Sequence, residues 1–462
     1  MSHHTKAAPA SPFSTSTPSW VASGDPLDVV IVGGGQSGLA IAFALKLAGI
    51  DRIVVLDAAP RGGVGIWTTT ARMQTLRTPK SIPGPELGHV ALSFRSWFVG
   101  RFGEAEYDAI DLIPVRTWQD YLDWFQAELG IEVRYGHRVV GVEPGSLGVR
   151  LRVETTLGPH ELISRKLVLA TGIDGLGGPY IPDDILTRFA PEQYVHTADS
   201  VDYARFAGRD IGVVGGSASA FDAAATALQS GARSVHLLSR SRELAIASEG
   251  LVLPGFTPVQ TLHHLHSDAT RWDIVSTARR RGSVPARSVA RAKAYANFHL
   301  HLGYGTDRLS QAQGGIGLST NGGPVHLDNL IIGTGYRTDL ALRSELATVL
   351  PATLLWKHCH IGPNSADAYW GEWPYLGSGL QLLPRDPHAD GWVEAIHAYT
   401  YAAILSHGLH VGDIATAHIA VPRLVAAITS DLFRADQAVY AERALSGAHK
   451  LATLYAPTER AS

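Results

Sequence analysis

The hydrophobic positions of the chain repeat one pattern twice. Residues 28–32 (DVVIV) form a short, continuous apolar run that is typical of a strand buried on both faces of a parallel sheet. A Gly-rich turn follows, then the Ala- and Leu-rich stretch 39–49, which predicts a helix, and then a second apolar run at 52–60. The same order of strand, turn, helix and strand returns at 210–239. Two such units predict an α/β protein with two parallel sheets.

Two further apolar runs lie before and after the second unit in the sequence. Residues 167–172 (LVLATG) and 328–335 (DNLIIGTG) each predict a buried strand that leads directly into small residues. Small residues at such a place let the chain turn sharply or pass close to a ligand. Four of them are therefore candidate cofactor contacts: Thr171, Gly172, Thr334 and Gly335.

The second unit is best interpreted as an insertion into the first. We expect one domain to comprise residues 27–200 and 326–462, with helices at its C-terminal end, and the inserted domain to comprise residues 201–325. A chain of 462 residues is too long for one ordinary core, which agrees with two domains. Residues 1–26 are rich in Ser, Thr, Pro and Ala, and they predict a flexible tail.

Composition narrows the class of protein. The net charge of −3 argues against a nucleic-acid-binding surface, which would need a basic face. Cys359 is the single cysteine, so we expect no intrachain disulfide, no dithiol redox pair and a reducing cytoplasm as the compartment. No apolar run is long enough to span a membrane. The histidine-rich stretches 263–266 and 358–360 lack the spacing of zinc sites, so we expect no metal.

The first Gly-rich turn has the spacing of a dinucleotide-binding loop, G-x-G-x-x-G. Its glycines permit a tight turn, let a pyrophosphate approach the backbone and let the helix pack closely on the strand. The start of the helix attracts phosphates. Asp57 ends the second strand, where its carboxylate can accept hydrogen bonds from a ribose diol. The candidate contacts in this unit are Gly33, Gly35, Gln36, Ser37, Gly38 and Asp57.

The second Gly-rich turn departs from this pattern in a way that indicates a different nucleotide. Aligned on Gly215, it has Ser217 in place of the middle glycine. Where the first unit ends in an acid, the second ends in Ser239 followed by Arg240. An acid favours a free 2′-hydroxyl, whereas hydroxyl and guanidinium groups favour a 2′-phosphate, so we assign FAD to the first loop and NADPH to the second. A duplicated fold that binds nothing is the alternative. The candidate NADPH contacts are Gly215, Ser217, Ser219, Ala220, Ser239 and Arg240.

In this order the motifs resemble those of the class B flavoprotein monooxygenases. This family includes the flavin-containing monooxygenases, the Baeyer–Villiger monooxygenases and the ornithine/lysine N-hydroxylases. The resemblance covers residues 28–385 and includes Gly65-Ile66-Trp67, which is similar to the family's Gly-x-Trp. It implies two Rossmann-like domains, tightly bound FAD beneath Trp67 and a transient NADPH. It also implies that a C4a-peroxyflavin hydroxylates a small nitrogen-containing substrate.

Residues 73–80 are the place where the branches of this family are expected to differ in substrate. Met73-Gln74 resembles the N-hydroxylases, whereas the stretch LRTPK at 76–80 lacks the Asn of the flavin-containing monooxygenases. Residues 189–203 lack the Gly and Trp of the Baeyer–Villiger fingerprint. The candidate catalytic residues are Gln74, Arg77 and Lys80.

The chemistry of these three side chains leaves several functions open. Gln74 offers a hydrogen bond, and the cations Arg77 and Lys80 could hold an anionic substrate, although either could instead lie on the surface or bind an FAD phosphate. We favour N-hydroxylation of an amine; ring hydroxylation of a flat heterocycle such as urate is the first alternative. An NADPH-dependent flavin reductase without productive oxygenation and a non-catalytic nucleotide sensor are further alternatives. The expected partners are a small substrate and O2, and the C-terminal helices could form a dimer face.

Overall fold

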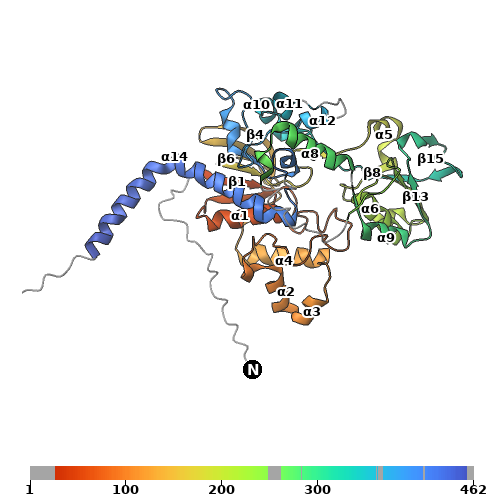
Figure 1. The fold of residues 1–462 in the computed structure, drawn as a ribbon, viewed down its shortest axis with the longest axis horizontal. Helices are drawn as coiled ribbons and strands as arrows, with labels where there is room; N and C mark the ends of the chain where they lie inside the picture. Colours follow the sequence, from red (N-terminus) through yellow and green to blue (C-terminus); the bar gives the residue numbers. More distant parts are fainter. Residues whose placement is uncertain are drawn as a thin grey trace, which may run out of the picture.

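The computed structural model describes residues 26–247, 262–281, 283–360, 362, 368–408 and 411–454. The expected tail, residues 1–26, lies outside this part of the chain apart from Pro26. Two sheets with parallel strands form the framework (Figure 1), and they confirm the predicted α/β fold with two Rossmann-like domains. None of the described helices is long and apolar enough to cross a membrane.

The first sheet grows from the strand that precedes the first Gly-rich turn. It contains β1 (Leu27–Val32), β2 (Ile53–Asp57), β3 (Val133–Tyr135), β4 (Arg138–Gly145), β5 (Gly148–Thr155), β6 (Gly158–Leu169) and β19 (Ile396–Ala398). The parallel order β3-β2-β1-β6 continues into the antiparallel pair β5-β4, and β19 runs parallel to the end of β6. The centre of β1 is fully buried, as expected for a strand covered on both faces.

Helices cover this sheet and build an aromatic layer beside it. They include α1 (Gln36–Leu47), α2 (Phe94–Phe102), α3 (Glu104–Ala109) and α4 (Val115–Glu128). The ring of Tyr121 on α4 lies 5.0 Å from that of Trp118 and 5.6 Å from that of Phe94 on α2, measured between centroids. These rings belong to the buried core of the first domain.

The second sheet is wholly parallel and has the order β13-β10-β9-β17-β8. Its strands are β8 (Tyr194–His196), β9 (Asp210–Val214), β10 (Ser234–Ser239), β13 (Phe298–Leu302) and β17 (Asn329–Ile332). Strands β8 and β17 lie just outside residues 201–325, the range expected for the inserted domain. They join this sheet because β17 pairs with both β9 and β8.

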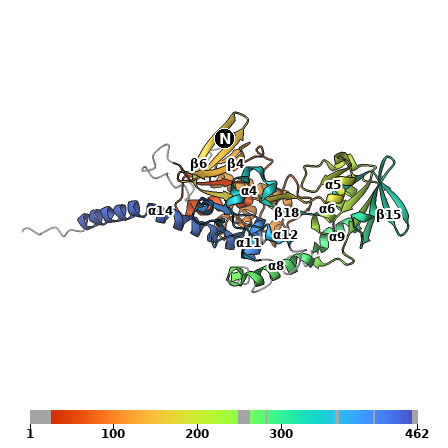
Figure 2. The ribbon, with the colours of Figure 1, turned by 90° about the horizontal axis from the view of Figure 1, so that it is seen from above.

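Each face of the second sheet has its own cover (Figures 1 and 2). One face packs on α6 (Ala218–Gln229) and α9 (Ala286–Lys293), and the apolar side chains of these helices and strands form one core. On the other face lies a separate small core with the antiparallel strands β14 (Leu309–Ala312), β15 (Gly315–Thr320) and β16 (Gly323–Leu327).

Two neighbouring segments carry the chain between the domains. Strand β7 (Gly177–Pro179) leaves the first domain, β18 (Tyr336–Thr338) returns to it, and the two pair antiparallel. A Cβ placed on Gly177 would lie 1.8 Å from the carbonyl oxygen of Arg337, so only glycine fits where these strands cross.

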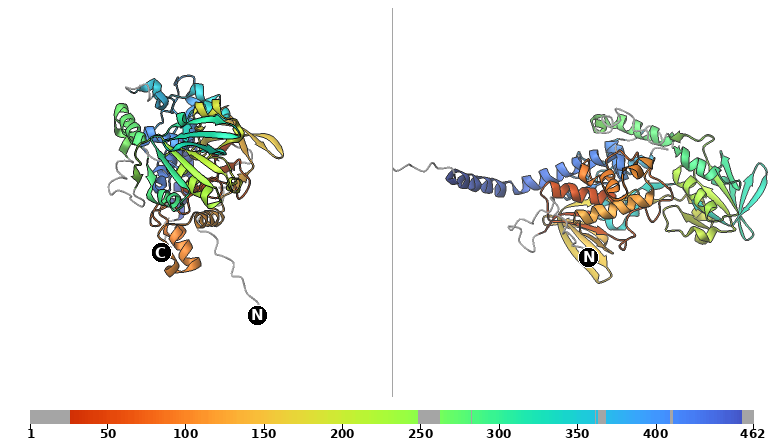
Figure 3. Two further views of the ribbon diagram at one scale, coloured as in Figure 1. Left: turned by 90° about the vertical axis from the view of Figure 1, so that its right-hand side faces the viewer. Right: turned by 90° about the horizontal axis from the view of Figure 1, so that it is seen from below.

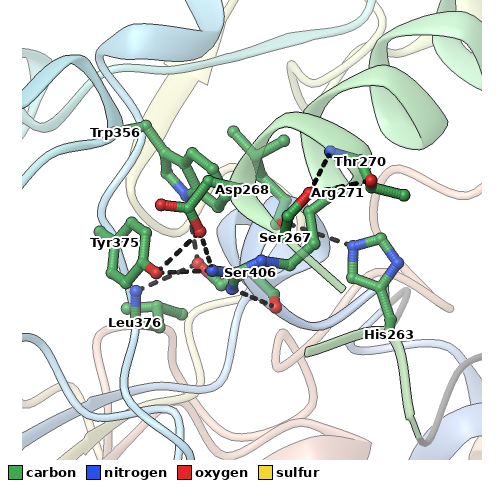
Figure 4. Close-up of polar contacts among 10 residues, drawn as sticks. His263, Ser267, Asp268, Thr270, Arg271, Trp356, Tyr375, Leu376 and Ser406 are labelled. Carbon is green, nitrogen blue, oxygen red and sulfur yellow. Dashed lines mark hydrogen bonds and ion pairs between the residues drawn. The ribbon is translucent and has the colours of Figure 1, made fainter. Parts of the chain in front are cut away.

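Helix α8 (Asp268–Arg281) lies within the inserted stretch but packs on the first domain (Figures 1 and 2). Trp272 and Val275 of this helix belong to the core of the first domain. Arg271 anchors it: the guanidinium pairs with Asp268, donates to the carbonyl oxygen of Ser406 at 3.1 Å and lies 4.9 Å from the ring centroid of Trp356 (Figure 4). The inserted segment is therefore tied to the core of the first domain by a buried cation.

The C-terminal helix α14 (Ala417–Leu454) begins against α1 and extends away from the body of the molecule (Figures 1 and 3). Ion pairs from β6 hold it, with Lys166 Nζ 2.6 Å from Asp431 and Arg165 Nη1 2.7 Å from Asp436. Besides short 3-10 helices, the remaining described elements are α5 (Asp183–Arg188), β11 (Ile246–Ala247), β12 (Val284–Pro285), α10 (Val349–Ala352), α11 (Trp356–Cys359), α12 (Ala368–Gly371) and α13 (Ile404–His407).

Candidate functional site

The first loop, residues 33–38, adopts a geometry that only glycine permits at two positions. Gly33 has φ +112°, and a Cβ there would lie 2.3 Å from the carbonyl oxygen of Ala170. A Cβ on Gly38 would lie 1.9 Å from the carbonyl oxygen of Gly33, within the same turn. These contacts agree with the roles predicted for the first and last glycines, namely the tight turn and the close packing of helix on strand.

A cavity of about 430 Å³ lies beside this loop. A Cβ placed on Gly35 would meet only the Cα of Gly65, at 3.7 Å, so the middle glycine leaves the backbone open toward the cavity. The first turn of α1, residues 36–39, holds no acidic side chain that would oppose a phosphate. This cradle fits the pyrophosphate of a dinucleotide. The other lining residues include Gln36, Arg61, Trp67, Gln126 and Tyr135.

Asp57 is fixed at the end of β2 by two backbone groups. Its Oδ2 accepts from the Gly34 N–H at 2.8 Å, and its Oδ1 accepts from the Ala59 N–H at 2.8 Å. Each carboxylate oxygen can accept a further hydrogen bond, so the residue fits its predicted role toward a ribose diol.

Gln36 and Ser37 face the C-terminal part of the chain. The Gln36 amide donates to the carbonyl oxygen of Gly412 at 2.6 Å and accepts from the Trp118 indole N–H at 3.2 Å. Ser37 lines a second, much smaller cavity with Tyr399 and Gly412. The first turn of α1 is thereby tied both to α4 and to the segment before α14.

The second loop, residues 215–220, reproduces the strand–turn–helix geometry with different residues. Gly215 has φ +144°, and a Cβ there would lie 2.3 Å from the carbonyl oxygen of Gly333. Ser217 has φ −112°, which any residue adopts, so serine at the middle position causes no backbone strain. Ser217 and Ser219 are exposed, whereas Ala220 is buried. Ala220 packs closely on the backbone of Gly333, since a Cβ placed on Gly333 would lie 2.8 Å from the Cβ of Ala220.

The two polar residues at the end of β10 differ in exposure. Ser239 is 3% exposed and lies behind the second loop, since a Cβ on Gly216 would be 2.4 Å from its Oγ. Arg240 is exposed. The guanidinium is therefore the group that can reach a 2′-phosphate outside the loop, while the hydroxyl forms part of the wall beneath it.

The small residues at the two strand ends serve the turns between the domains. Gly172 and Gly335 have φ of +87° and +84°. Thr171 Oγ1 donates to the carbonyl oxygen of Gly175 at 3.2 Å, and Thr334 Oγ1 donates to that of Tyr180. Hydrogen bonds within the two crossing segments thus already engage both threonine hydroxyls.

The three predicted catalytic residues do not converge on one point. Gln74 is exposed, and its carbonyl oxygen accepts from the Val115 N–H at 3.1 Å. Lys80 Nζ contacts Tyr107 of α3: it donates to the backbone carbonyl oxygen at 2.7 Å and lies 4.4 Å from the centroid of the tyrosine ring. Arg77 points instead to the second domain, where its Nη2 lies 3.1 Å from Asp222 Oδ2. Their catalytic roles remain predictions.

Some residues that the sequence reasoning missed lie at this junction. Asp222 on α6 is 5% exposed, and burial raises its pKa above the ordinary carboxyl range although the nearby Arg77 and Arg291 oppose that shift. Asp222 closes the sequence IGVVGGSASAFD, so the second fingerprint itself was the signal that could have found it. In the first domain, Tyr135 pairs with Asp57 across β3 and β2 and lines the larger cavity.

Metal-ligating groups do not gather in the part of the chain that the structure describes. No cluster of three or more His, Cys, Asp or Glu side chains there is placed to hold a metal ion. Cys359 is exposed as a residue, but its thiol is partly shielded from solvent, and this partial burial together with nearby Asp268 raises its pKa.

The fold and the two loops define an oxidoreductase with two dinucleotide-binding domains. Residues 30–252 match the family described as "Pyridine nucleotide-disulphide oxidoreductase". The FAD-dependent urate hydroxylase of Xanthomonas campestris pv. campestris is 36% identical over 428 residues, which cover 91% of this chain and 89% of that protein. The chain therefore belongs to the class B flavoprotein monooxygenases, whose cofactors are FAD and NADPH, as its two fingerprints predict.

Solved structures give the same result for the fold. Ornithine hydroxylase from Pseudomonas aeruginosa superposes with a TM-score of 0.67 at 18% identity, covering 88% of this chain and all of that one. L-lysine 6-monooxygenase from Pseudomonas syringae superposes with a TM-score of 0.63 at 16% identity, covering 87% of this chain and 98% of that one.

Proposed function

We propose that this protein uses NADPH and O2 to hydroxylate a small, flat, anionic nitrogen heterocycle, with urate as the first candidate. The observation that carries the proposal is the charge of the 69–80 segment, which links the FAD loop region to the nucleotide domain. Arg72, Arg77 and Lys80 lie in this segment, and Arg291 of α9 contacts it. Asp222 offsets the charge of Arg77, so the attraction of this segment for an anion rests on Arg72 and Lys80.

The same charges disfavour an amine. A primary ammonium group is repelled by these cations, so an amine substrate would need a free carboxylate nearby. The carboxylate that lies beside Arg77 is that of Asp222. Asp222 is buried and lies within 3.1 Å of Arg77 and 3.9 Å of Arg291, so its charge is already compensated. We therefore place the heterocycle ahead of the amine, which reverses the order that Met73-Gln74 indicated.

Similarity to known proteins supports this order. The urate hydroxylase of Xanthomonas campestris pv. campestris is similar over nearly the whole chain, at 36% identity. The ornithine and lysine hydroxylases are below 20% identical, so they support the fold and not the substrate.

The chain's own groups would perform binding, orientation and exclusion of water. The open backbone at Gly35 and the start of α1 would hold the pyrophosphate of FAD, Asp57 its ribose and Trp67 the wall of its cavity. When bound, FAD supplies the transfer of electrons from NADPH to O2. In the overall reaction one oxygen atom forms the new C–O bond, the other leaves as water, and NADPH provides two electrons. Arg72 would orient the anion, because Arg77 is already paired with Asp222.

Product analysis under ¹⁸O2 tests this proposal. The enzyme is supplied with NADPH and, separately, with urate, xanthine, ornithine, lysine or cadaverine. We expect urate to stimulate NADPH oxidation and to yield a product that carries one ¹⁸O atom. Hydroxylation of an amine without reaction of urate would contradict the proposed substrate. NADPH oxidation that yields only hydrogen peroxide with every compound would instead support the reductase alternative.

A further inference from the structure

The 69–80 segment is held by the second domain through an ion pair whose carboxylate is buried. Arg77 belongs to this segment, and Asp222 lies in the second turn of α6, the helix that begins directly after Ser217. We propose that Asp222 is a positioning residue, which couples the NADPH-binding end of α6 to the 69–80 segment. The inference rests on the proposed function in that it takes the second loop to be the NADPH site.

The buried carboxylate sets this pair apart from surface ion pairs, although the Arg77 side chain is 39% exposed. The Asp222 side chain is 6% exposed and lies 3.1 Å from Arg77 and 3.9 Å from Arg291. A carboxylate in such a place depends on its cations, because removal of one partner leaves a buried charge unpaired. Exposed pairs, in contrast, contribute little. The contact therefore fixes the position of Arg77 relative to α6.

A second set of contacts holds the same segment nearby. Arg291 donates to the carbonyl oxygen of Arg72 at 2.7 Å and to Thr226 Oγ1 at 3.1 Å and Gln229 Oε1 at 3.0 Å, both on α6. Arg72 in turn lies 5.1 Å from the ring centroid of Tyr203. The segment is thus attached to α6 at Asp222 and, through Arg291, one and two turns further along that helix.

Helix α6 and the ion pair between Asp222 and Arg77 connect the second loop to the 69–80 segment. A displacement of the first turn of α6 moves Asp222, since both lie on one helix, and Asp222 moves Arg77. The segment that contains Arg77 follows Trp67, which lines the cavity beside the first loop. Occupation of the second loop by NADPH or NADP⁺ is therefore expected to order residues 69–80, where the substrate is proposed to lie.

Hydrogen–deuterium exchange with and without NADP⁺ tests the coupling independently of turnover. In the wild-type protein loaded with FAD, NADP⁺ should slow exchange both at residues 215–221 and at residues 69–80. In Asp222→Asn, which keeps the shape and removes the charge, protection should remain at 215–221 and fall by at least tenfold at 69–80. The rate of flavin reduction by NADPH should fall by about tenfold in the same variant.

Matched variants separate coupling from a general loss of structure. Asp111→Asn removes an exposed ion pair with Arg287 that also joins the two domains, and it should behave as the wild type. Arg77→Lys keeps the charge and should retain most of the protection at 69–80, whereas Arg77→Gln should lose it. These two variants carry the test if Asp222→Asn does not fold.

The outcomes also distinguish this inference from the proposed function. If NADP⁺ protects residues 215–221 but leaves 69–80 unchanged in the wild type, or if Asp222→Asn and Arg77→Gln keep full protection there, the coupling is refuted and the cofactor assignment stands. If NADP⁺ protects neither region of the wild type, the assignment of NADPH to the second loop fails.

Discussion

Asp57 accepts a hydrogen bond from the backbone N–H of Gly34 at 2.8 Å, so the acid that ends β2 is bound to the loop that ends β1. At the equivalent place in the second domain, Ser239 lies against Gly216, and the next residue, Arg240, is exposed. One fold is therefore used twice with opposite charges at the end of its second strand. We propose that this difference selects FAD for the first loop and NADPH for the second.

Replacing Gly35 with valine should abolish FAD retention. The new side chain would occupy the space between Gly35 and Gly65 where the backbone is open to the cavity, and would prevent the close approach of a pyrophosphate. The FAD content of the purified protein, read from its absorbance, measures the effect. Gly100→Ala, in α2 and with open space around it, is the control and should stay yellow. A fully loaded Gly35→Val protein would refute the assignment of the first loop.

Replacing Arg240 with aspartate should raise the KM for NADPH about ten- to hundredfold and leave that for NADH nearly unchanged. The lost contact is a charge-assisted hydrogen bond, which contributes about 1.5–3 kcal/mol. Steady-state kinetics with both nucleotides measure the ratio. Arg205→Asp introduces the same charge change on an exposed residue of the second domain before β9, and it should alter both KM values equally and slightly. An equal effect of Arg240→Asp on the KM values for NADPH and NADH would contradict the proposed contact of Arg240 with the 2′-phosphate.

Folding stability should fall as the pH is lowered from about 6.5 toward 4. Burial lowers the pKa of His236, His263 and His397 to about 4 and that of His407 to about 3. These histidines take up protons near pH 6.5 in the unfolded chain but not in the folded protein. The stability contributed by the neutral rings is therefore fully present above pH 6.5 and is lost as the pH falls toward 4.

His397→Asn isolates one of these groups. The ring is fully buried, and its Nδ1–H donates to the carbonyl oxygen of Gly379 at 2.9 Å, a bond that an amide can replace. The variant should have a shallower pH dependence in urea unfolding, by about 1.4 kcal/mol per pH unit between 6.5 and 4. An unchanged slope would show that His397 is not neutral in the folded state.

Replacing Arg271 with methionine should lower the free energy of unfolding by about 3 kcal/mol. The apolar stem would remain between the rings of Trp356 and Tyr375. The carbonyl oxygen of Ser406 would lose its donor, and Asp268 would lose its cation while still accepting from the Tyr375 hydroxyl at 3.0 Å. Denaturant unfolding measures the change. Arg434→Met, which removes a cation 74% exposed from its pair with Asp431, should change stability by less than about 0.5 kcal/mol. Equal effects of the two substitutions would contradict the role given to Arg271.

The sequence predicted the parts of the molecule that depend on local pattern. Apolar runs and glycine spacing are set by strand burial and by turn geometry, so both loops and their strands could be placed from residues 28–57 and 210–239 alone. The place of Asp57 at the end of β2 also followed from the sequence, because the register of a βαβ unit is fixed by its hydrophobic pattern; its contact with FAD remains a prediction.

Features that depend on which surfaces meet could not be predicted. Trp272 lies within the inserted stretch, yet it packs in the core of the first domain, because tertiary contact overrides sequence order. Arg77 and Lys80 were expected near a substrate, but the sequence could not show that Asp222 and the backbone of α3 bind them. The residues before and after the inserted range join its sheet for the same reason, as β8 and β17 show.

Anaerobic mixing of the purified protein with NADPH tests whether the chain holds FAD and reduces it with NADPH. We expect a yellow protein whose flavin is bleached by NADPH at a lower concentration than by NADH, and whose colour returns when O2 is admitted. A protein that binds no FAD, or one whose flavin is reduced by dithionite but not by NADPH, would contradict this expectation.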